Sequence, residues 1–206
     1  MIILDCEQGS EEWFKARLGV PSASNFHRVI TPTGKLSSQL DSYVNTLASE
    51  IITGQQYSSF ASDAMLRGQE LEPIAKNNFS FLESVKVEEV GFCIREDIKV
   101  GCSPDGIIDE CEGLEIKCPL AHNHLEYLRQ GELPAKYIAQ VQGSMYVSDF
   151  EVWHFYSYHP DFAENLSVEV YRDEIFIAQL KDHLTRVTDL IGEYVEKFKK
   201  GDEDVK

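Results

Sequence analysis

Residues 102–119 of the chain read CSPDGIIDECEGLEIKCP, and the polar residues in this stretch decide the fold that the sequence predicts. Alternate residues of a β-strand face the same side of a sheet, so Glu115 and Lys117 project together while Ile116 faces the core. If Asp105 ends the neighbouring strand, its carboxylate can share an ion with Glu115. This stretch therefore predicts neighbouring strands that bring two carboxylates and an ammonium group to one margin of a sheet.

This group of residues suits metal-assisted hydrolysis of a phosphodiester. Two carboxylates, the Ile116 carbonyl and water form an all-oxygen ligand set, which Mg²⁺ and Mn²⁺ prefer. A lysine such as Lys117, beside metal-bound water, favours the hydroxide and adds positive charge where negative charge develops at phosphorus. An exposed strand with an ordinary Glu/Lys pair has the same spacing, so the pattern needs support from other residues. Glu72, on a predicted helix, would bring a third carboxylate to the site.

Hydrophobic periodicity on either side of residues 102–119 predicts several helices. Apolar residues at helical spacing, together with Ser10 as an N-cap and Gly54 as a stop, are typical of helices. The predicted helices cover residues 10–19, a short segment capped by Ser22 or Ser24, residues 40–54, residues 62–81, a segment that starts near Pro134, and residues 175–198. Gly68 and Pro73 predict a kink or break in the helix at 62–81.

Alternating or continuous apolar runs predict the strands. These cover residues 85–94, 98–102, 107–109, 114–117 and 150–158, with an edge strand at 166–170. Together with the helices they predict an α/β (α+β) fold, in which a central mixed β-sheet is flanked by helices. We expect residues 1–206 to form a single domain with a frayed tail at 201–206.

Composition narrows the class of protein. With 206 residues, 43% of them hydrophobic, the chain can bury a sizeable core, so whole-chain disorder is excluded. The apolar runs are too short for a membrane-spanning helix, and the first residues lack the features of a secretory signal, so we expect a cytoplasmic protein. The five cysteines form an odd set without a C-x-x-C spacing, which argues against a disulfide framework.

Charge is distributed unevenly along the chain. The 19 Lys and Arg against 35 Asp and Glu give a net charge of −16, which by itself argues against a nucleic-acid partner. Residues 13–40, however, contain no Asp or Glu but several basic residues, among them Arg17. This gap is either a chance feature beside a solvated basic face or a site for phosphate. Arg17 would grip a terminal phosphate together with Ser22 and Ser24, or it would cap the C-terminal end of its own short helix.

Taken together, these residues resemble the motifs of a known family. Asp105 after a proline, followed by Glu115-Ile116-Lys117, is similar to the signature of the restriction-endonuclease-like nucleases of the PD-(D/E)XK type. The fuller set resembles the lambda exonuclease or YqaJ-type viral recombinase family. The matching segments run in chain order as EWFKARLG at 12–19, SAS at 22–24, Gly68-x-x-x-Glu72, CSPDG at 102–106, LEIKCP at 114–119 and AQVQ at 139–142.

The resemblance implies a role for each residue of the catalytic set and a restriction-endonuclease-like core to hold them. Asp105 and Glu115 would bind Mg²⁺, or Mn²⁺ in its place, with the Ile116 carbonyl. Lys117 would orient or activate the attacking water, and Glu72 would assist at the metal or at the water.

The resemblance also implies how a DNA end is bound. Four residues match positions that hold the 5′-terminal phosphate in the family: Arg17, Ser24, Ser103 and Gln140. Met65 matches an apolar wedge that parts the duplex end, and packing in the core is the alternative for this residue. Residues 120–124, LAHNH, form a predicted loop and differ from the polar and basic residues of the lambda enzyme. The resemblance therefore does not imply that this loop contacts DNA.

The activity implied by the resemblance is specific. Family members degrade the 5′ strand of double-stranded DNA processively in the 5′-to-3′ direction, which leaves a 3′ overhang for phage-type homologous recombination. They form ring-shaped homotrimers around DNA and pair with a single-strand annealing protein. We therefore expect a magnesium-dependent exodeoxyribonuclease, encoded by a phage or prophage and acting in the cytoplasm of a bacterial host. An acidic exterior suits such a protein if DNA enters only a lined channel.

Three other functions are compatible with parts of the sequence. One is a structure-specific or sequence-specific endonuclease on the same fold, and another is a non-catalytic protein that binds DNA ends. The third is a small zinc protein that uses Cys111, Cys118, His122 and His124, although this spacing fits no common zinc-ligand pattern.

Overall fold

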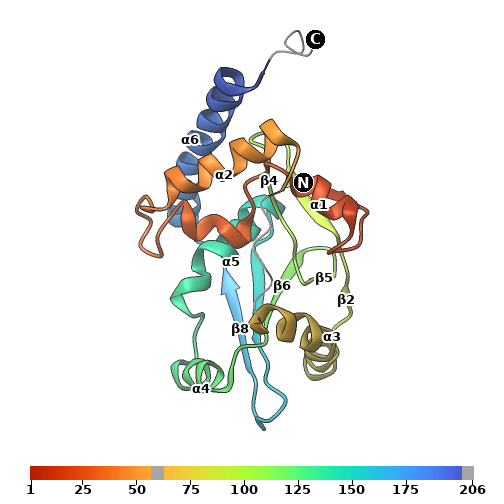
Figure 1. Ribbon diagram of the computed structural model, residues 1–206. Helices are drawn as coiled ribbons and strands as arrows, with labels where there is room; N and C mark the ends of the chain where they lie inside the picture. Colours follow the sequence, from red (N-terminus) through yellow and green to blue (C-terminus); the bar gives the residue numbers. More distant parts are fainter. Residues whose placement is uncertain (57–62, 201–206) are drawn as a thin grey trace.

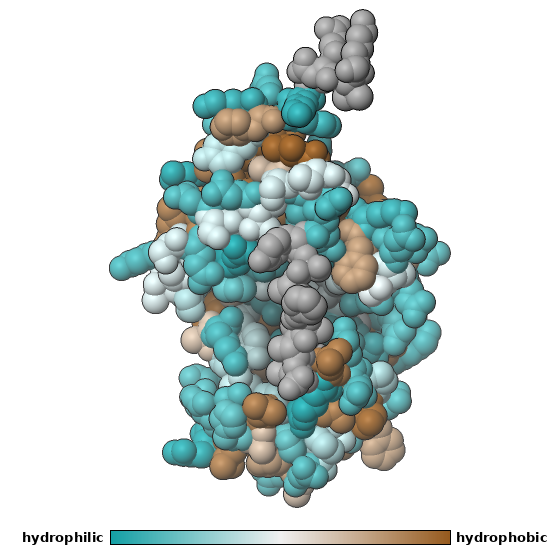
Figure 2. All heavy atoms as spheres, in the orientation of Figure 1, coloured by the Kyte–Doolittle hydropathy of each residue, from teal (hydrophilic) through white to brown (hydrophobic). Residues whose placement is uncertain are grey.

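The computed structural model describes residues 1–56 and 63–200, without the side chains of residues 63–65. Residues 57–62 and 201–206 lie outside this description, so the tail predicted to fray is not among the described residues. Within the described ranges, every helix is too short or too polar to cross a membrane. Figure 2 shows a mostly hydrophilic face with scattered hydrophobic residues, as expected for a chain with a net charge of −16.

A five-stranded mixed sheet forms the centre of the structure (Figure 1). Its strands lie in the order β2 (Val87–Glu88), β5 (Gly106–Ile108), β6 (Glu112–Lys117), β7 (Val152–Ser157) and β8 (Leu166–Tyr171). Strands β6 and β7 are parallel and the other neighbours are antiparallel, while β8 lies at the edge, so the predicted mixed sheet and edge strand are confirmed. A parallel pair needs a crossover connection, which here contains the helices α4 (Ala121–Gln130) and α5 (Ile138–Ser148).

A second sheet has three strands, in the order β1 (Ile2–Leu4), β3 (Phe92–Arg95) and β4 (Val100–Cys102). The prediction of one strand at residues 85–94 was therefore wrong, because β2 belongs to the large sheet and β3 to the small one. Gly91 lies between them, where an added Cβ would be 2.2 Å from the carbonyl oxygen of Cys6. The chain changes sheet at a close backbone approach that only glycine fits. Strand β1 was not predicted, since three residues are too few to show an alternating pattern.

Helices flank the two sheets. They are α1 (Glu11–Arg17), the 3₁₀ helix η1 (Ala23–Arg28), α2 (Leu40–Thr53), α3 (Asp63–Glu83), α4, the 3₁₀ helix η2 (Ala135–Tyr137), α5 and α6 (Glu174–Phe198). As predicted, Ser10 caps α1 by accepting a hydrogen bond from the Trp13 N–H, and Gly54 ends α2 with a φ of 67°. Figure 1 shows α2 and α6 together at one end of the molecule and α3 and α4 near the other.

Two of the sequence predictions about helices need correction. A kink or a break was predicted at Gly68 and Pro73; helix α3 runs unbroken through both residues, so a break is wrong, while a kink stays a prediction. A proline inside a helix costs about 3 kcal/mol, but the fully buried Ala75 and Phe79 pack against the large sheet and hold the helix in place. Residues 120–124, predicted as a loop, mostly belong to α4. The buried face of α4 includes His124. Because histidine is not an apolar residue, a search for apolar periodicity does not detect this face.

The two faces of β6 pack against different elements. Leu114 and Ile116 are buried on one face, in a cluster with Phe79 of α3. Glu115 and Lys117 project from the other face, towards α5 and η2. The prediction that Ile116 faces the core while its two neighbours point the opposite way is confirmed.

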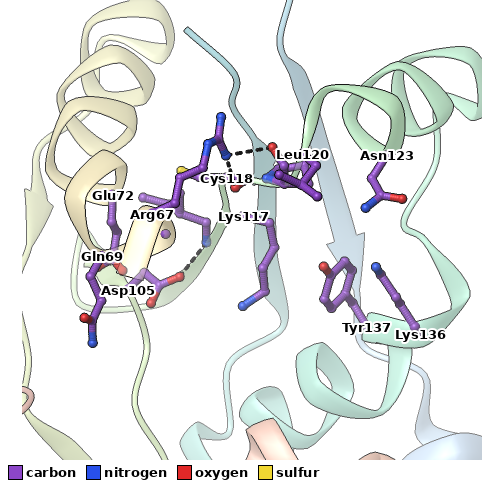
Figure 3. Close-up of a pocket in the computed structure, with 13 residues that line it drawn as sticks. Arg67, Gln69, Glu72, Asp105, Lys117, Cys118, Leu120, Asn123, Lys136 and Tyr137 are labelled. Carbon is purple, nitrogen blue, oxygen red and sulfur yellow. Dashed lines mark hydrogen bonds between the residues drawn. The ribbon is translucent and has the colours of Figure 1, made fainter. Parts of the chain in front are cut away.

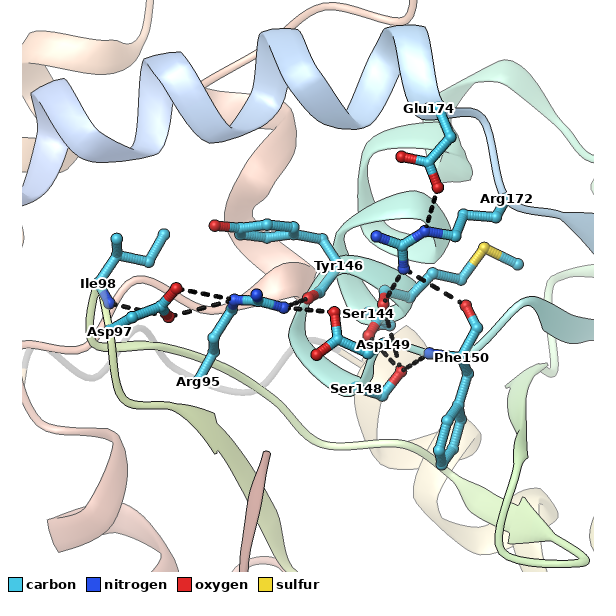
Figure 4. Close-up of polar contacts among 11 residues, drawn as sticks. Arg95, Asp97, Ile98, Ser144, Tyr146, Ser148, Asp149, Phe150, Arg172 and Glu174 are labelled. Atoms are coloured by element: carbon cyan, nitrogen blue, oxygen red, sulfur yellow. Dashed lines mark hydrogen bonds and ion pairs between the residues drawn. The ribbon is translucent and has the colours of Figure 1, made fainter.

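Helix α5 is held at its C-terminal end by two arginines (Figure 4). Arg95 on β3 donates a hydrogen bond to the Tyr146 carbonyl at 2.7 Å and forms an ion pair with Asp149. Arg172, which follows β8, donates to the Met145 carbonyl at 2.8 Å. Cations that bind the last carbonyls of a helix stabilise its C-terminal end. These contacts fix the position of α5, whose first turn reaches the cluster around Glu115.

Candidate active site

Glu115 lies at the centre of a cluster of polar side chains at the end of β6. Its side chain is 2% exposed, and its carboxylate forms an ion pair with the Lys117 ammonium. Gln140, on the first turn of α5, donates from Nε2 to Glu115 Oε1 at 2.6 Å. Lys117 Nζ also lies 5.5 Å from the centre of the Tyr137 ring. In the predicted Glu115/Lys117 pair, Glu115 is therefore buried and Lys117 half-buried, so this is not an ordinary exposed ion pair on a strand.

Asp105 reaches the same cluster from the loop between β4 and β5. Its backbone N–H donates to the Leu114 carbonyl at 3.0 Å, and its carboxylate accepts a hydrogen bond from the Ile116 N–H at 2.6 Å. Asp105 was expected to share an ion with Glu115 if it ended the neighbouring strand; it instead comes just before that strand, β5, and is held against β6 by these two bonds. Gln8 supports the same loop by donating to the Pro104 carbonyl at 2.8 Å.

The cluster opens onto a cavity of about 460 Å³ (Figure 3). Glu72 lines it from α3, Asp105 from its loop and Lys117 from β6. Figure 3 shows Tyr137 and Lys136 on the wall opposite the carboxylates. Glu72 and Asp105 also line a second cavity, of about 330 Å³. The structure thus brings all the predicted catalytic side chains to one place.

Burial and mutual repulsion raise the pKa values of these carboxyl groups. Burial, followed by repulsion from Asp105, raises the pKa of Glu72 to about 7. Burial raises the pKa of Glu115 to about 7 against the opposing effect of Lys117, and burial also raises the pKa of Asp105. Burial would lower the pKa of Lys117, but Glu115 and Asp105 outweigh it and raise that pKa. The cluster holds more negative charge than its surroundings stabilise, and a bound cation would relieve this excess.

The donor set fits a hard divalent cation. Carboxylate and carbonyl oxygens are the ligands that Mg²⁺ and Mn²⁺ prefer. As the side chains stand in the described part of the chain, no group of three or more His, Cys, Asp or Glu is arranged to hold a metal ion. Glu115 is turned towards Lys117 and Gln140 instead. The chemistry of the donors therefore fits the metal, with the half-buried Asp105 and the buried Glu115 as the carboxylates that would hold it.

A second polar site surrounds Arg17 at the end of α1. Its guanidinium donates to Ser103 Oγ at 3.1 Å and to Ser22 Oγ at 3.3 Å. It also lies over the Trp13 ring, 4.2 Å from the ring centre, and Trp13 Nε1 donates to the same Ser103 Oγ at 3.0 Å. Burial lowers the pKa of Arg17. Because the guanidinium is directed at two serines and not at the last carbonyls of α1, the structure argues against the helix-cap alternative.

The other residues predicted to bind the terminal phosphate divide between the two sites. Ser24 Oγ lies 3.4 Å from Ser22 Oγ, beside Arg17. Gln140 is hydrogen-bonded to the carboxylate cluster instead, although Gln140 and Ser24 both line a further cavity of about 450 Å³. Met65 is part of α3, but its side chain lies outside the described residues, so the prediction of an apolar wedge stays a prediction.

Sequence reasoning missed several residues that the fold brings to these sites. Arg67 on α3 donates to the carbonyls of Cys118 and Pro119 at 2.7 and 2.9 Å, which joins α3 to the end of β6 (Figure 3). The others are Gln8, Trp13, Lys136 and Tyr137. The partners of Gln8 and Trp13 are far away in the chain, 96 positions for Gln8 and Pro104 and 90 for Trp13 and Ser103. Of these residues, Trp13 had a signal in the sequence, because it lies in the first segment that matches the family.

The structure does not favour the zinc alternative. His124 is fully buried, and both of its ring nitrogens are engaged. Nδ1 lies 2.8 Å from Ser157 Oγ, and Nε2 lies 3.1 Å from the Glu164 carbonyl oxygen. Cys111 is exposed at the turn before β6. His124 therefore joins α4 to the segment that follows β7.

Comparisons with known proteins agree with this geometry. A family model described as the YqaJ-like viral recombinase domain matches residues 12–151, which include Arg17 and the whole carboxylate cluster. The chain belongs to this family. The resemblance seen in the sequence is therefore confirmed. No curated protein sequence matches the chain.

Solved structures support the same conclusion. The alkaline exonuclease (LHK-Exo) from Laribacter hongkongensis is 31% identical, with a TM-score of 0.84 over 92% of this chain and 96% of that chain. The same protein in complex with dAMP gives a TM-score of 0.83 at the same identity and coverage. A phage related exonuclease from Haemophilus somnus 129PT has a TM-score of 0.70 over 86% of this chain and 96% of that chain, and its 15% identity shows the fold alone. The predicted restriction-endonuclease-like α+β fold is thus confirmed.

Proposed function

We propose that this member of the YqaJ-like viral recombinase family is a metal-dependent DNA exonuclease. The observation that carries the proposal is the meeting of Glu72, Asp105 and Lys117 at one cavity, with Glu115 paired to Lys117 beside it. A fold by itself does not carry an activity, because unrelated functions share folds. Here the carboxylates and the lysine are the groups that hydrolysis of a phosphodiester requires, and a 31% identical structure is that of an alkaline exonuclease.

The proposed cofactor is Mg²⁺, with Mn²⁺ as a substitute, held by Asp105, Glu115 and the Ile116 carbonyl. Such an ion lowers the pKa of bound water and polarises a phosphate oxygen. Lys117 would orient the attacking water and stabilise the negative charge that develops at phosphorus. The raised pKa of Glu72, about 7, suits this residue to exchange a proton with that water.

The Arg17 pocket supports recognition of a 5′-terminal phosphate. Arg17 is half-buried and donates to two serine hydroxyls, which leaves further N–H donors of its guanidinium for the oxygens of a phosphate. Ser24, Ser103 and Gln140 would contact the remaining phosphate oxygens, and Met65 would part the duplex. Because this phosphate exists only at a strand end, the enzyme would digest double-stranded DNA processively from 5′ to 3′ and leave 3′ overhangs.

The proposed biological setting follows from the family. The chain would act as a single nuclease domain in phage-type recombination, in the cytoplasm of a bacterial host, with a single-strand annealing protein as partner. We propose a ring-shaped homotrimer, since a closed ring keeps an acidic protein on DNA topologically. Light scattering should give the mass of three chains, and a stable monomer at micromolar concentration would contradict the ring.

One digestion experiment tests the reaction, its direction and its cofactor together. Linear duplex DNA with 5′-phosphate or 5′-hydroxyl ends and closed circular DNA are incubated with and without Mg²⁺. We expect digestion of linear DNA only, with a preference for 5′-phosphate ends and a requirement for the metal. Cleavage of the circle would indicate an endonuclease, and binding to ends without hydrolysis would indicate a non-catalytic end-binding protein.

A further inference from the structure

Lys136 is a cation that neither the catalytic cluster nor the Arg17 pocket uses. It lies in η2, directly before Tyr137, and its side chain is exposed. Among the described residues its ammonium has no hydrogen-bond acceptor and no carboxylate partner, and its contacts are with two aromatic rings. In a chain with 35 acidic residues, a lysine without an acidic partner at a cavity wall is available to an anion from outside.

Aromatic rings hold Lys136 in place. Its Nζ lies 4.9 Å from the centre of the Tyr137 ring and 5.2 Å from that of Tyr127. Contacts of this kind contribute about 0.5–1 kcal/mol each at exposed sites. The Tyr137 ring also contacts Lys117, so one ring orients the catalytic lysine and Lys136 together. In Figure 3, Lys136 and Tyr137 lie side by side, across the cavity from Asp105.

Lys136 and Tyr137 line two cavities at once. One is the catalytic cavity of about 460 Å³. The other is the cavity of about 450 Å³ that Ser24 and Gln140 also line. Ser24 and Gln140 are two of the residues proposed for the terminal phosphate, so DNA that is bound both there and at the catalytic carboxylates lies beside Lys136.

We propose that Lys136, oriented by Tyr127 and Tyr137, binds a backbone phosphate of the DNA beside the catalytic carboxylates. The ligand is an internal phosphodiester, which carries one negative charge and is present whatever the chemistry of the strand end. The inference rests on the proposed function, because it needs DNA in the catalytic cavity. It differs from the role of Arg17, which concerns the terminal phosphate alone.

The salt dependence of DNA binding measures this contact, because a lysine that neutralises a phosphate releases counterions from the DNA. Each phosphate that a protein neutralises changes the slope of log K against log salt concentration by about 0.7 for single strands and about 0.9 for duplex DNA. Lys136→Gln should therefore make the slope shallower by about 0.7–0.9 and weaken binding about five- to eightfold near 0.1 M salt. Lys136→Arg keeps the charge and should keep the slope.

Fluorescence anisotropy with duplex DNA provides the test, in EDTA to prevent hydrolysis and across about 50–300 mM KCl. The duplexes carry 5′-hydroxyl or 5′-phosphate ends. Lys197→Gln is the matched control, because Lys197 Nζ also lies over an aromatic ring, 5.1 Å from the centre of Phe198, but on α6 and outside both cavities. Circular dichroism of each variant verifies that the fold is retained.

We expect Lys136→Gln to make the slope shallower on both duplexes, while Lys136→Arg and Lys197→Gln match the unmutated protein. An unchanged slope in Lys136→Gln overturns the inference. A loss confined to 5′-phosphate duplexes also overturns it, since Lys136 would then belong to the terminal-phosphate pocket. The proposed function fails separately, if the unmutated protein neither binds nor digests linear DNA.

Discussion

Replacing Arg17 by alanine should abolish the proposed selection of 5′-phosphate ends. The guanidinium has five N–H donors, and two of them donate to Ser103 and Ser22. Three donors therefore remain for a terminal phosphate, enough for a bidentate contact. A 5′-hydroxyl end presents no such phosphate, so its digestion should not depend on Arg17.

The size of the effect follows from the contact that is lost. A hydrogen bond to a charged group contributes about 1.5–3 kcal/mol, which corresponds to about a 10- to 150-fold change in kcat/KM. Arg17→Ala should therefore lower kcat/KM on 5′-phosphate ends by that factor and leave 5′-hydroxyl ends nearly unchanged. The variant also loses the stacking of Arg17 on Trp13, which removes about 0.5–2 kcal/mol from the free energy of unfolding.

A matched control variant distinguishes the loss of a stacking contact from the loss of phosphate recognition. Arg28 lies in the same acid-free segment, 4.7 Å from the centre of the Tyr43 ring, and donates to Ser42. Arg28→Ala should lose a similar stacking contact but keep the preference for 5′-phosphate ends. Gel-based digestion of the two substrates, at a temperature where circular dichroism shows every variant folded, gives the ratio of rates. Equal digestion of both ends by the unmutated enzyme, or an equal loss on both in Arg17→Ala, would refute the reasoning.

The remaining predictions concern the carboxylate cluster. Asp105→Ala and Glu115→Ala should abolish hydrolysis while circular dichroism shows an intact fold, and normal activity in either variant would remove that residue from the metal site. Lys117→Ala should bind metal and DNA but lose about 100- to 1,000-fold in single-turnover rate; loss of metal binding, measured by calorimetry, would contradict this role. In the metal-free protein the pKa values of Glu72 and Glu115 rise from 4.5 to about 7, so the folded state binds more protons than the unfolded state between these values. The free energy of unfolding in urea should therefore fall as the pH rises from about 4.5 to about 7. Glu115→Gln should make this fall smaller, and an undiminished fall would argue against a raised pKa at this position.

Local patterns in the sequence were sufficient to locate helices and strands whose apolar residues recur at a regular spacing. Apolar residues every three or four positions located α2 and α6, because a helix that packs on a core must present one apolar face to it. The two-residue period of a strand placed Glu115 and Lys117 on the same face of β6. These relations join residues only a few positions apart, so they hold whatever the rest of the chain does.

Local patterns failed where packing overrides them. Residues 85–94 alternate like one strand, yet the chain changes sheet at Gly91, where Cys6 approaches its backbone. Helix α3 continues through Pro73 because the burial of Phe79 offsets the lost hydrogen bond. In both cases the deciding contact comes from a segment that the pattern does not include.

The geometry of the two sites was decided by tertiary structure alone. Asp105 is held by the Ile116 N–H, Gln140 reaches Glu115 across 25 positions, and Arg17 reaches Ser103 across 86. These last contacts are side-chain hydrogen bonds between distant segments, and they form only where the packing of sheets and helices brings donor and acceptor within about 3 Å. Sequence spacing carries no information on such distances. The residues of the candidate catalytic cluster could therefore be named from the sequence, while their partners could be found only in the folded chain.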